Sequence, residues 1–296
     1  MITLNDSMRA RFGCKVYKLA LDGGFTCPVR DGTLDTRGCI FCSAGGSGEF
    51  AESRAISITE QIEQGKKRVA GKIRDGKYIA YFQAYTGTYA DLPRLRKLYR
   101  EAISHSDIAA LSVATRPDCL PEEVLDLLLE LNREKPVWIE LGLQTIHEKT
   151  AEYIRRGYPL SVYDKAVAEL KARGIEIITH LILGLPGETA EDMCASVRYV
   201  CAGRTDGIKL QLLHILKGTD LAKEYEEGRV HALTEDEYID ILKKCVPEIP
   251  DSVVVHRLTG DGDKRLLIAP LWSADKKHVL SRIRREVMLP RPGLVL

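Results

Sequence analysis

Three cysteines that lie close together are the residues of this chain best suited to hold a metal. Cys27, Cys39 and Cys42 fall within sixteen residues, and a glycine-rich run at 43–48 follows them. Thiolates are soft ligands that select zinc, copper(I) or iron–sulfur clusters. A closed zinc site takes four ligands, but the stretch has one Cys-x-x-Cys pair, and no histidine precedes His105. The count of three favours a four-iron cluster with one open iron, and a loop with a zinc half-site is the alternative.

The segments around this stretch alternate between apolar strands and helices. Strands are predicted at 15–21, 78–83, 108–114, 137–143, 175–183 and 207–213, with a short terminal strand at 252–257. Helices are predicted at 57–74, 92–105, 121–132, 147–154, 161–173, 189–202 and 234–246. Such alternation favours parallel βαβ units. Six units predict an α/β fold, a partial (β/α)6 TIM-like barrel with its ligand groups at the C-terminal strand ends.

Composition and charge narrow the class of protein. A chain of 296 residues with 45% hydrophobic and 29% charged residues is typical of a soluble globular protein. The net charge of +1 gives no global field for nucleic acid, and no apolar run reaches the roughly 18 residues of a spanning helix. Eight cysteines in a chain this long are not a disulfide framework. We therefore expect a cytoplasmic protein with no membrane partner.

The cysteine stretch resembles the cluster loop of the radical-SAM superfamily, with eleven residues in place of the usual three between the first two cysteines. With residues 15–26 before it, the spacing is similar to the YhcC/YtqA-type branch, which is related to the radical-SAM half of the elongator catalytic subunit. The resemblance runs from Phe12 to Trp272. It implies a [4Fe–4S] cluster on Cys27, Cys39 and Cys42. It also implies that S-adenosylmethionine binds the open iron and is cleaved to a 5′-deoxyadenosyl radical.

The resemblance also implies where the cofactor is contacted. Gln83 and Thr86 follow the second strand, where relatives hold the methionyl amino group. Residues 140–145 resemble the family's Gly-x-Gln-Ser/Thr segment, and alternation puts Glu140, Gly142 and Gln144 on one face. The buried carboxylate and amide need partners, which ribose hydroxyls would supply; a mutually satisfied polar pair is the alternative. Arg156 is the implied partner of the methionyl carboxylate.

Later strand ends supply further candidates. Residues 184–189 resemble a turn beside adenine, with Ile182 as an apolar surface and Gly184 allowing close backbone approach. His180 is either a ribose or substrate contact or a satisfied core histidine. His214, Lys217 and Cys119 are candidates for catalysis, with an inert buried thiol as the alternative for Cys119.

Two further residues have open interpretations. Arg116 is either a bidentate ligand for a carboxylate or phosphate, or an ion-pair partner of Asp118. Cys14 would close the cluster as a fourth ligand, but it precedes the first strand, which argues against ligation.

We expect one barrel at 1–258, with its cluster loop at 22–50, and a basic C-terminal extension at 259–296 packed on it. The segment 273–296 contains two acidic residues, Asp275 and Glu286, and six basic ones: Lys276, Lys277, Arg282, Arg284, Arg285 and Arg291. Such a segment either contacts RNA phosphates or is the solvated face of a docked helix.

The resemblance implies a tRNA substrate. In this branch the carboxymethyl group is removed from 5-carboxymethylaminomethyluridine at the wobble position, which leaves aminomethyluridine for a methyltransferase partner. A reductant such as flavodoxin or ferredoxin would supply the electron. The alternatives are a radical-SAM enzyme for a small molecule or peptide, and a non-catalytic metal-bearing RNA-binding module.

Overall fold

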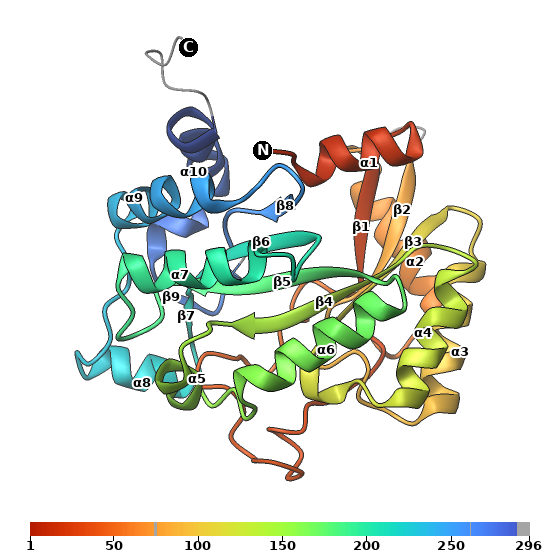
Figure 1. Ribbon diagram of the computed structural model, residues 1–296, viewed down its shortest axis with the longest axis horizontal. Helices are drawn as coiled ribbons and strands as arrows, with labels where there is room; N and C mark the ends of the chain where they lie inside the picture. Colours follow the sequence, from red (N-terminus) through yellow and green to blue (C-terminus); the bar gives the residue numbers. More distant parts are fainter. Residues whose placement is uncertain (74–75, 261, 289–296) are drawn as a thin grey trace.

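The computed structural model describes residues 1–73, 76–260 and 262–288, which form one large curled parallel sheet wrapped by helices (Figure 1). The sheet order is β1-β2-β3-β4-β5-β6-β8, and each neighbouring pair is parallel. Its strands are β1 (Val16–Leu21), β2 (Lys77–Phe82), β3 (Ile108–Thr115), β4 (Val137–Gln144), β5 (Glu176–Leu183), β6 (Gly207–Leu212) and β8 (Val254–Arg257). The predicted α/β partial barrel is confirmed, and the short terminal strand joins it as the seventh strand.

Helices connect the strands and cover the outer face of the sheet (Figure 1). They are α1 (Leu4–Phe12), α2 (Ile58–Val69), α3 (Leu92–Ser104), α4 (Glu122–Asn132), α5 (Glu148–Tyr153), α6 (Leu160–Ala172), α7 (Ala190–Cys201), α8 (Asp220–Glu226), α9 (Glu235–Cys245) and α10 (Lys276–Ile283). The helix predicted to reach Arg74 ends at Val69, and Arg74 lies outside the described residues. None of the helices in the described ranges has both the length and the apolarity that a membrane crossing requires.

Alternation along the strands sorts side chains into an outer and an inner set. In β4, Ile139, Leu141 and Leu143 point outward into the main core beneath the helices, whereas Trp138 points inward. Trp138 belongs to an inner apolar layer that also contains Met8 of α1. Helix α1 therefore closes the N-terminal end of the barrel (Figure 1).

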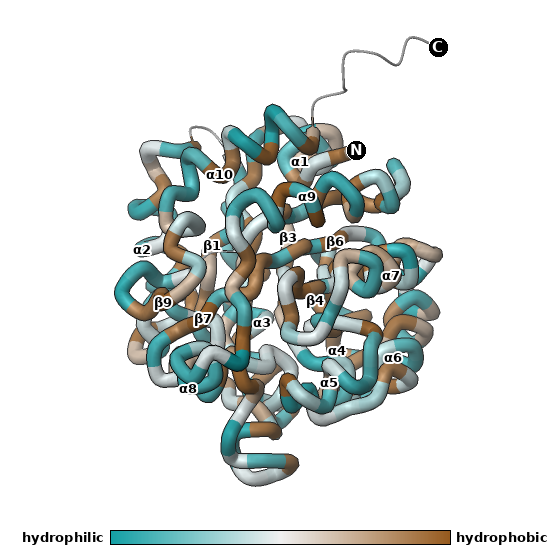
Figure 2. The backbone as a smooth tube through the Cα atoms, turned by 90° about the vertical axis from the view of Figure 1, so that its left-hand side faces the viewer, coloured by the Kyte–Doolittle hydropathy of each residue, from teal (hydrophilic) through white to brown (hydrophobic). Residues whose placement is uncertain are grey.

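The chain beyond the sheet folds back onto it. Strand β7 (Ile215–Leu216) pairs antiparallel with β9 (Leu267–Ala269). Helix α10 buries Val279 and Ile283. Figure 1 places α1, α9 and α10 at one end of the molecule and the orange-red β1–α2 loop at the opposite end. Figure 2 shows these three helices together from another side.

Candidate active site

The three cysteines lie in the long loop between β1 and α2, at the C-terminal end of the sheet. Arg30 supports this loop, because its Nη2 donates to the carbonyl oxygens of Cys42 and of the next residue, both at 2.6 Å. The Ile40 amide donates to the carbonyl of Ile154 at 3.3 Å, which ties the loop to the end of α5. These contacts hold the cysteine-bearing turn over the barrel.

Cys27, Cys39 and Cys42 line one cavity of about 250 Å³. Their three sulfur atoms do not all lie within 4.8 Å of one another. Among the described residues, one group of His, Cys, Asp or Glu side chains has its ligand atoms within that distance, and it contains no cysteine. A single zinc ion binds sulfur at about 2.3 Å, which places tetrahedral ligands about 3.8 Å apart. The three thiols, as they are placed, are therefore too far apart for one zinc ion to bind all of them.

Burial controls the protonation of these thiols. It raises the pKa of Cys39 to about 12, with Cys42 adding to the shift and Arg116 opposing it. Burial also raises the pKa of Cys42, against the neighbouring Arg30 guanidinium. Because thiolates are the metal ligands, assembly of a cluster here must release protons.

Three non-glycine residues of the cavity wall have a left-handed backbone: Ser47 (φ 66°), Tyr85 (φ 58°) and Gln144 (φ 72°). This conformation is costly for L-residues and clusters at functional sites. The Tyr85 hydroxyl donates to the Ala44 carbonyl, and a Cβ on Gly46 would lie 2.4 Å from the Tyr85 ring. The close contact fixes the glycine-rich run against the end of β2.

Most of the inner side chains one layer above the inner apolar layer of Trp138 and Met8 are polar or charged. Glu140 is fully buried, and its Oε1 accepts hydrogen bonds from Lys18 Nζ and, at 2.7 Å, from Ser112 Oγ. Its Oε2 accepts from Lys209 Nζ and, at 2.7 Å, from His180 Nε2. We call these five residues the charged floor of the cavity. Two ammonium groups share one carboxylate there.

The protonation of the floor follows from its hydrogen bonds. His180 Nε2 donates to Glu140, while its Nδ1 lies 3.3 Å from the Gln211 amide nitrogen and accepts from it. Burial, with Lys209 adding to it, lowers the pKa of His180 to about 4, so this imidazole is neutral. Although burial opposes it, the Lys18 and Lys209 charges hold the pKa of Glu140 well below its ordinary value. Burial lowers the pKa of Lys209 to about 7.

Above the floor, the inner positions are small, and Ala114 and Gly142 leave the hollow open. Four of the sequence-predicted cofactor residues line the cavity at or above this level: Gln83, Thr86, Gln144 and Ile182. Gln144 Oε1 is buried without a hydrogen-bond partner in the described structure. A buried acceptor of this kind needs a donor, and a ligand hydroxyl would supply it.

Two sequence-predicted residues that line the cavity have their polar atoms committed to the protein. Arg156 is 2% exposed; its Nε donates to the Tyr158 carbonyl at 2.9 Å and its Nη1 to the Thr145 carbonyl at 2.6 Å. Its third nitrogen pairs with Glu148 at 3.1 Å. Arg156 therefore supports the turn after β4. Glu140 is engaged by its four floor partners, as described above.

Of the remaining predicted residues, one lines the cavity and three do not. His214 lines it, with Nε2 3.2 Å from Ser273 Oγ. Gly184 packs near Leu233, and Lys217 is exposed outside the lining. Cys119 is buried and lines a separate cavity of about 840 Å³, where burial raises its pKa to about 12.

The two residues with open interpretations are also placed. Arg116 makes a bidentate ion pair with Asp118 at 2.9 and 2.7 Å, as one of its two interpretations predicts. Cys14 lies between α1 and β1, at the opposite end of that strand from the cluster loop.

Three floor residues, Lys18, Ser112 and Lys209, were not among the sequence predictions, nor were Tyr81 and Gln211, which hydrogen-bond to the floor. A signal for two of them is present in the sequence. Lys18 and Lys209 stand inside strands that are otherwise mostly apolar, and a charge in a central parallel strand needs a buried partner. The partner, Glu140, belongs to a third strand, so its identity required the fold.

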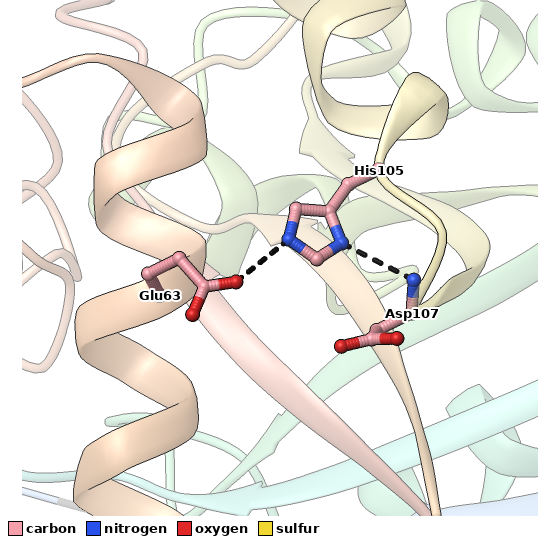
Figure 3. A group of neighbouring side chains, drawn as sticks. All are labelled: Glu63, His105 and Asp107. Carbon is pink, nitrogen blue, oxygen red and sulfur yellow. Dashed lines mark hydrogen bonds and ion pairs between the residues drawn. The ribbon is translucent and has the colours of Figure 1, made fainter.

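A second group of side chains that could bind a metal lies between α2 and the start of β3 and consists of Glu63, His105 and Asp107 (Figure 3). His105 Nε2 lies 2.8 Å from Glu63, and the Asp107 amide donates to His105 Nδ1 at 3.2 Å. Lys66 Nζ bridges both carboxylates, at 2.7 Å from Glu63 and 2.6 Å from Asp107. The lysine supplies the cation between these carboxylates, so the group is an ion network that joins α2 to β3.

Comparison with family models assigns the chain. The Radical SAM superfamily model matches residues 36–200, which is 165 of the 296 residues, and the Radical_SAM C-terminal domain model matches 205–288. This chain belongs to the radical SAM superfamily. YtqA of Bacillus subtilis (strain 168) is 46% identical over 285 residues, which cover 96% of this chain and 88% of that protein.

Two more distant comparisons are with archaeal proteins. The tRNA uridine(34) acetyltransferase of Methanocaldococcus jannaschii is 26% identical over 196 residues, which cover 64% of this chain and 36% of that enzyme. The structure of Methanocaldococcus infernus Elp3 with an N-terminal deletion superposes with a TM-score of 0.65 at 18% identity, covering 91% of this chain and 65% of that one. The second comparison shows a shared fold.

Radical SAM enzymes use a [4Fe–4S] cluster and S-adenosylmethionine. The residues of this site fit both groups. Three soft thiol ligands beside one cavity suit an iron–sulfur cluster, and the buried, unpartnered Gln144 oxygen suits a ligand hydroxyl such as those of a nucleoside. Cys27, Cys39 and Cys42 would hold the cluster.

Proposed function

We propose that this radical SAM protein removes the carboxymethyl group from 5-carboxymethylaminomethyluridine at the wobble position of tRNA, leaving aminomethyluridine. The observation that carries the proposal is the cavity, which has cysteines at its mouth, a charged floor and a narrow hollow between them. The similarity to a tRNA uridine(34) acetyltransferase supports the choice of tRNA.

The chain's own residues would bind and orient the reactants. With the cluster and S-adenosylmethionine bound, the cofactors would supply a 5′-deoxyadenosyl radical that takes a hydrogen atom from the methylene beside the carboxylate. Loss of one further electron to a one-electron acceptor would give an imine, and water would cleave its C–N bond, releasing the carboxymethyl group as glyoxylate and leaving the amine. In this proposal Gln144 Oε1 accepts a hydrogen bond from a ribose hydroxyl, and the Ile182 side chain packs against the adenine. The buried walls exclude water from the reacting atoms.

The surface around the cavity suits an RNA that enters from the C-terminal end of the strands. Gly262 and Asp263 line the cavity, and the exposed Lys264 and Arg265 follow them directly. The exposed Lys217 lies beside them, because its amide donates to the Leu266 carbonyl at 2.8 Å. We call Lys217, Lys264 and Arg265 the rim cations and propose that they contact tRNA phosphates.

The test uses tRNA from cells that lack the protein. It is incubated without oxygen with the iron-loaded protein, S-adenosylmethionine and a reductant such as flavodoxin, and its nucleosides are analysed by mass spectrometry. We expect carboxymethylaminomethyluridine to fall and aminomethyluridine to rise, with 5′-deoxyadenosine formed alongside. The Cys42→Ala protein is the matched control. A methyltransferase added afterwards should convert the product further.

Two outcomes would overturn the proposal in different ways. If 5′-deoxyadenosine forms but the tRNA nucleosides stay unchanged, the substrate is a small molecule or a peptide. If iron-loaded protein forms no 5′-deoxyadenosine with any reductant, the chain is a non-catalytic metal-bearing RNA-binding module.

A further inference from the structure

The charged floor holds more positive than negative charge. Lys18 and Lys209 both bond to Glu140, while His180 is neutral. His256 on β8 is also neutral, because burial lowers its pKa well below the ordinary value. Even without Arg257, which lines the same cavity, two ammonium groups face one carboxylate. Unbalanced charge in a poorly solvated interior is costly, so a second anion would stabilise this floor.

Lys209 is the floor cation that faces the cavity. Its side chain lines the hollow, whereas that of Lys18 does not. Lys209 Nζ donates to Glu140 and, at 3.2 Å, to the Tyr81 hydroxyl. An ammonium has three N–H donors, and the third has no acceptor among the described residues. One donor therefore remains for a ligand and, while Lys209 is protonated, one unit of positive charge remains as well.

The carboxylate of S-adenosylmethionine is not expected to bind Lys209 on the charged floor. The methionyl carboxylate of S-adenosylmethionine is expected at the open iron, above the cysteines. Gln144 and Glu140 are four residues apart on β4, which is roughly 13 Å along an extended strand. The floor thus lies well below the level where Gln144 and the cysteines would hold the cofactor. Space between the two levels remains for part of the substrate.

We propose that Lys209 binds a carboxylate group of the substrate, and that Lys18 and Glu140 hold its ammonium in position. The identity of that group rests on the proposed function, in which it is the carboxymethyl end of the wobble side chain. A carboxylate anchored on the floor turns its adjoining methylene toward the cysteine end of the cavity. Lys209 would thereby select substrates with a carboxylate and orient the carbon that loses hydrogen.

The first test measures binding to the anaerobic, iron-loaded protein. Two tRNAs that differ only in carrying carboxymethylaminomethyluridine or aminomethyluridine are titrated against the wild type, Lys209→Met and Lys67→Met. Lys67 is an exposed lysine on α2 and serves as the matched control. We expect the wild type and Lys67→Met to prefer the carboxylate-bearing tRNA about tenfold, since a hydrogen bond to a charged group has this strength. Lys209→Met should bind both tRNAs equally, and a retained preference would overturn the proposal.

The second test does not need tRNA. N-methylglycine carries the same methylene and carboxylate, and its amide, which lacks the carboxylate, is the control. N-methylglycine should raise the melting temperature of the wild type by a few degrees but not that of Lys209→Met. If inorganic phosphate at equal ionic strength stabilises the wild type and N-methylglycine does not, the carboxylate assignment is wrong.

The two tests separate the possible failures. Stabilisation by N-methylglycine without discrimination between the tRNAs would retain the carboxylate site and reject the tRNA substrate. The variant itself adds a further check. Lys209→Met leaves Glu140 paired with Lys18 and removes the excess charge, so it should melt no lower than the wild type without ligand. A large loss of stability would instead show that Lys209 has a purely structural role.

Discussion

Glu140 is the residue around which the interior of this barrel is organised. Its carboxylate lies where the sequence predicts a ribose contact, but Lys18, Ser112, His180 and Lys209 occupy both of its oxygens. Glu140 is therefore satisfied, but not in a mutual pair with Gln144, because its partners come from four other strands and Gln144 Oε1 has no hydrogen-bond partner in the described structure. At the residue scale, its carboxylate holds the ammonium groups of Lys18 and Lys209 together at the floor of the cavity.

Replacing Glu140 tests this role. Glu140→Gln would leave two buried ammonium groups without a counter-charge, and we expect the free energy of unfolding to fall by about 3–5 kcal/mol in denaturant titrations. Ser112→Ala, which removes one neutral donor from the same carboxylate, should cost about 1 kcal/mol. The double variant Glu140→Gln with Lys209→Met should recover part of the loss, because the two sites interact directly. A destabilisation of less than about 1 kcal/mol in the single variant would contradict this account.

The titration of Lys209 predicts a pH dependence for the carboxylate site. The charged or titratable groups that face it are Lys18, Tyr81, Glu140, His180, His256 and Arg257. Burial lowers the Lys209 pKa to about 7, so the folded protein loses this proton as pH rises through 7. Affinity for N-methylglycine, measured by calorimetry, should therefore fall up to tenfold per pH unit between about 7.5 and 9. Lys209→Met should show no such slope.

The same shift affects stability with a defined sign. The unfolded chain keeps the lysine proton up to about pH 10.4, so it binds more protons than the folded chain between about 7 and that value. The contribution of Lys209 to the free energy of unfolding consequently rises with pH over this window. The penalty for its buried charge is complete below pH 7.

Single cysteine replacements test the metal ligands. Cys42→Ala should lose most of its iron and sulfide after anaerobic reconstitution, because two thiolates remain where three are needed. Cys14→Ala should keep the wild-type iron content, since β1 separates it from the cluster loop. Loss of iron in Cys14→Ala would instead mean that Cys14 completes a closed site.

At the scale of elements, predictability from sequence followed the length of the periodic signal. The strands from 108 to 183 and the helices α3, α4 and α7 were predicted to within a few residues, because each buries a continuous apolar face. Strand β7 has two residues and pairs with β9 about fifty residues later, so no local pattern marks it. Helix α1 was not predicted, because Met8 is its one buried residue and it has no continuous apolar face. The capping box formed by Thr3 and Asp6 is the local signal for it in the sequence.

The glycine-rich run offers a prediction about one element. Gly46→Ala would place a methyl group against the Tyr85 ring and force the cluster loop away from β2. We expect slower cluster assembly and faster loss of iron to a chelator, followed by absorbance. Gly203→Ala is the matched control, because Gly203 also has a positive φ (78°) but no atom within 4 Å of an added Cβ. Equal effects in both variants would attribute the change to backbone strain alone.

At the scale of the whole molecule, barrel closure brings together residues that no local pattern connects. Lys18 and Lys209 are 191 positions apart in sequence, yet both donate to Glu140. The sequence could therefore indicate the barrel and the cysteines, but not which inward side chains meet. The basic C-terminal segment illustrates the same point. Arg282 and His278 pair with Glu235, and Arg282 also pairs with Asp236, so part of its charge docks α10 on α9; Arg291 lies outside the described residues.

The positions of the two basic regions predict which end of the molecule meets tRNA. Helix α10 lies at the end opposite the cluster loop, whereas the rim cations adjoin the cavity lining (Figure 1). Reversing Lys264 and Arg265 to glutamate should weaken tRNA binding at least tenfold and flatten its salt dependence by about 0.7–0.9 logarithmic units for each phosphate that is no longer neutralised. Reversing Arg284 and Arg285, which are also exposed, should change affinity less than twofold. Fluorescence anisotropy between about 50 and 200 mM salt would measure both, and the opposite ranking would show that tRNA binds across α10.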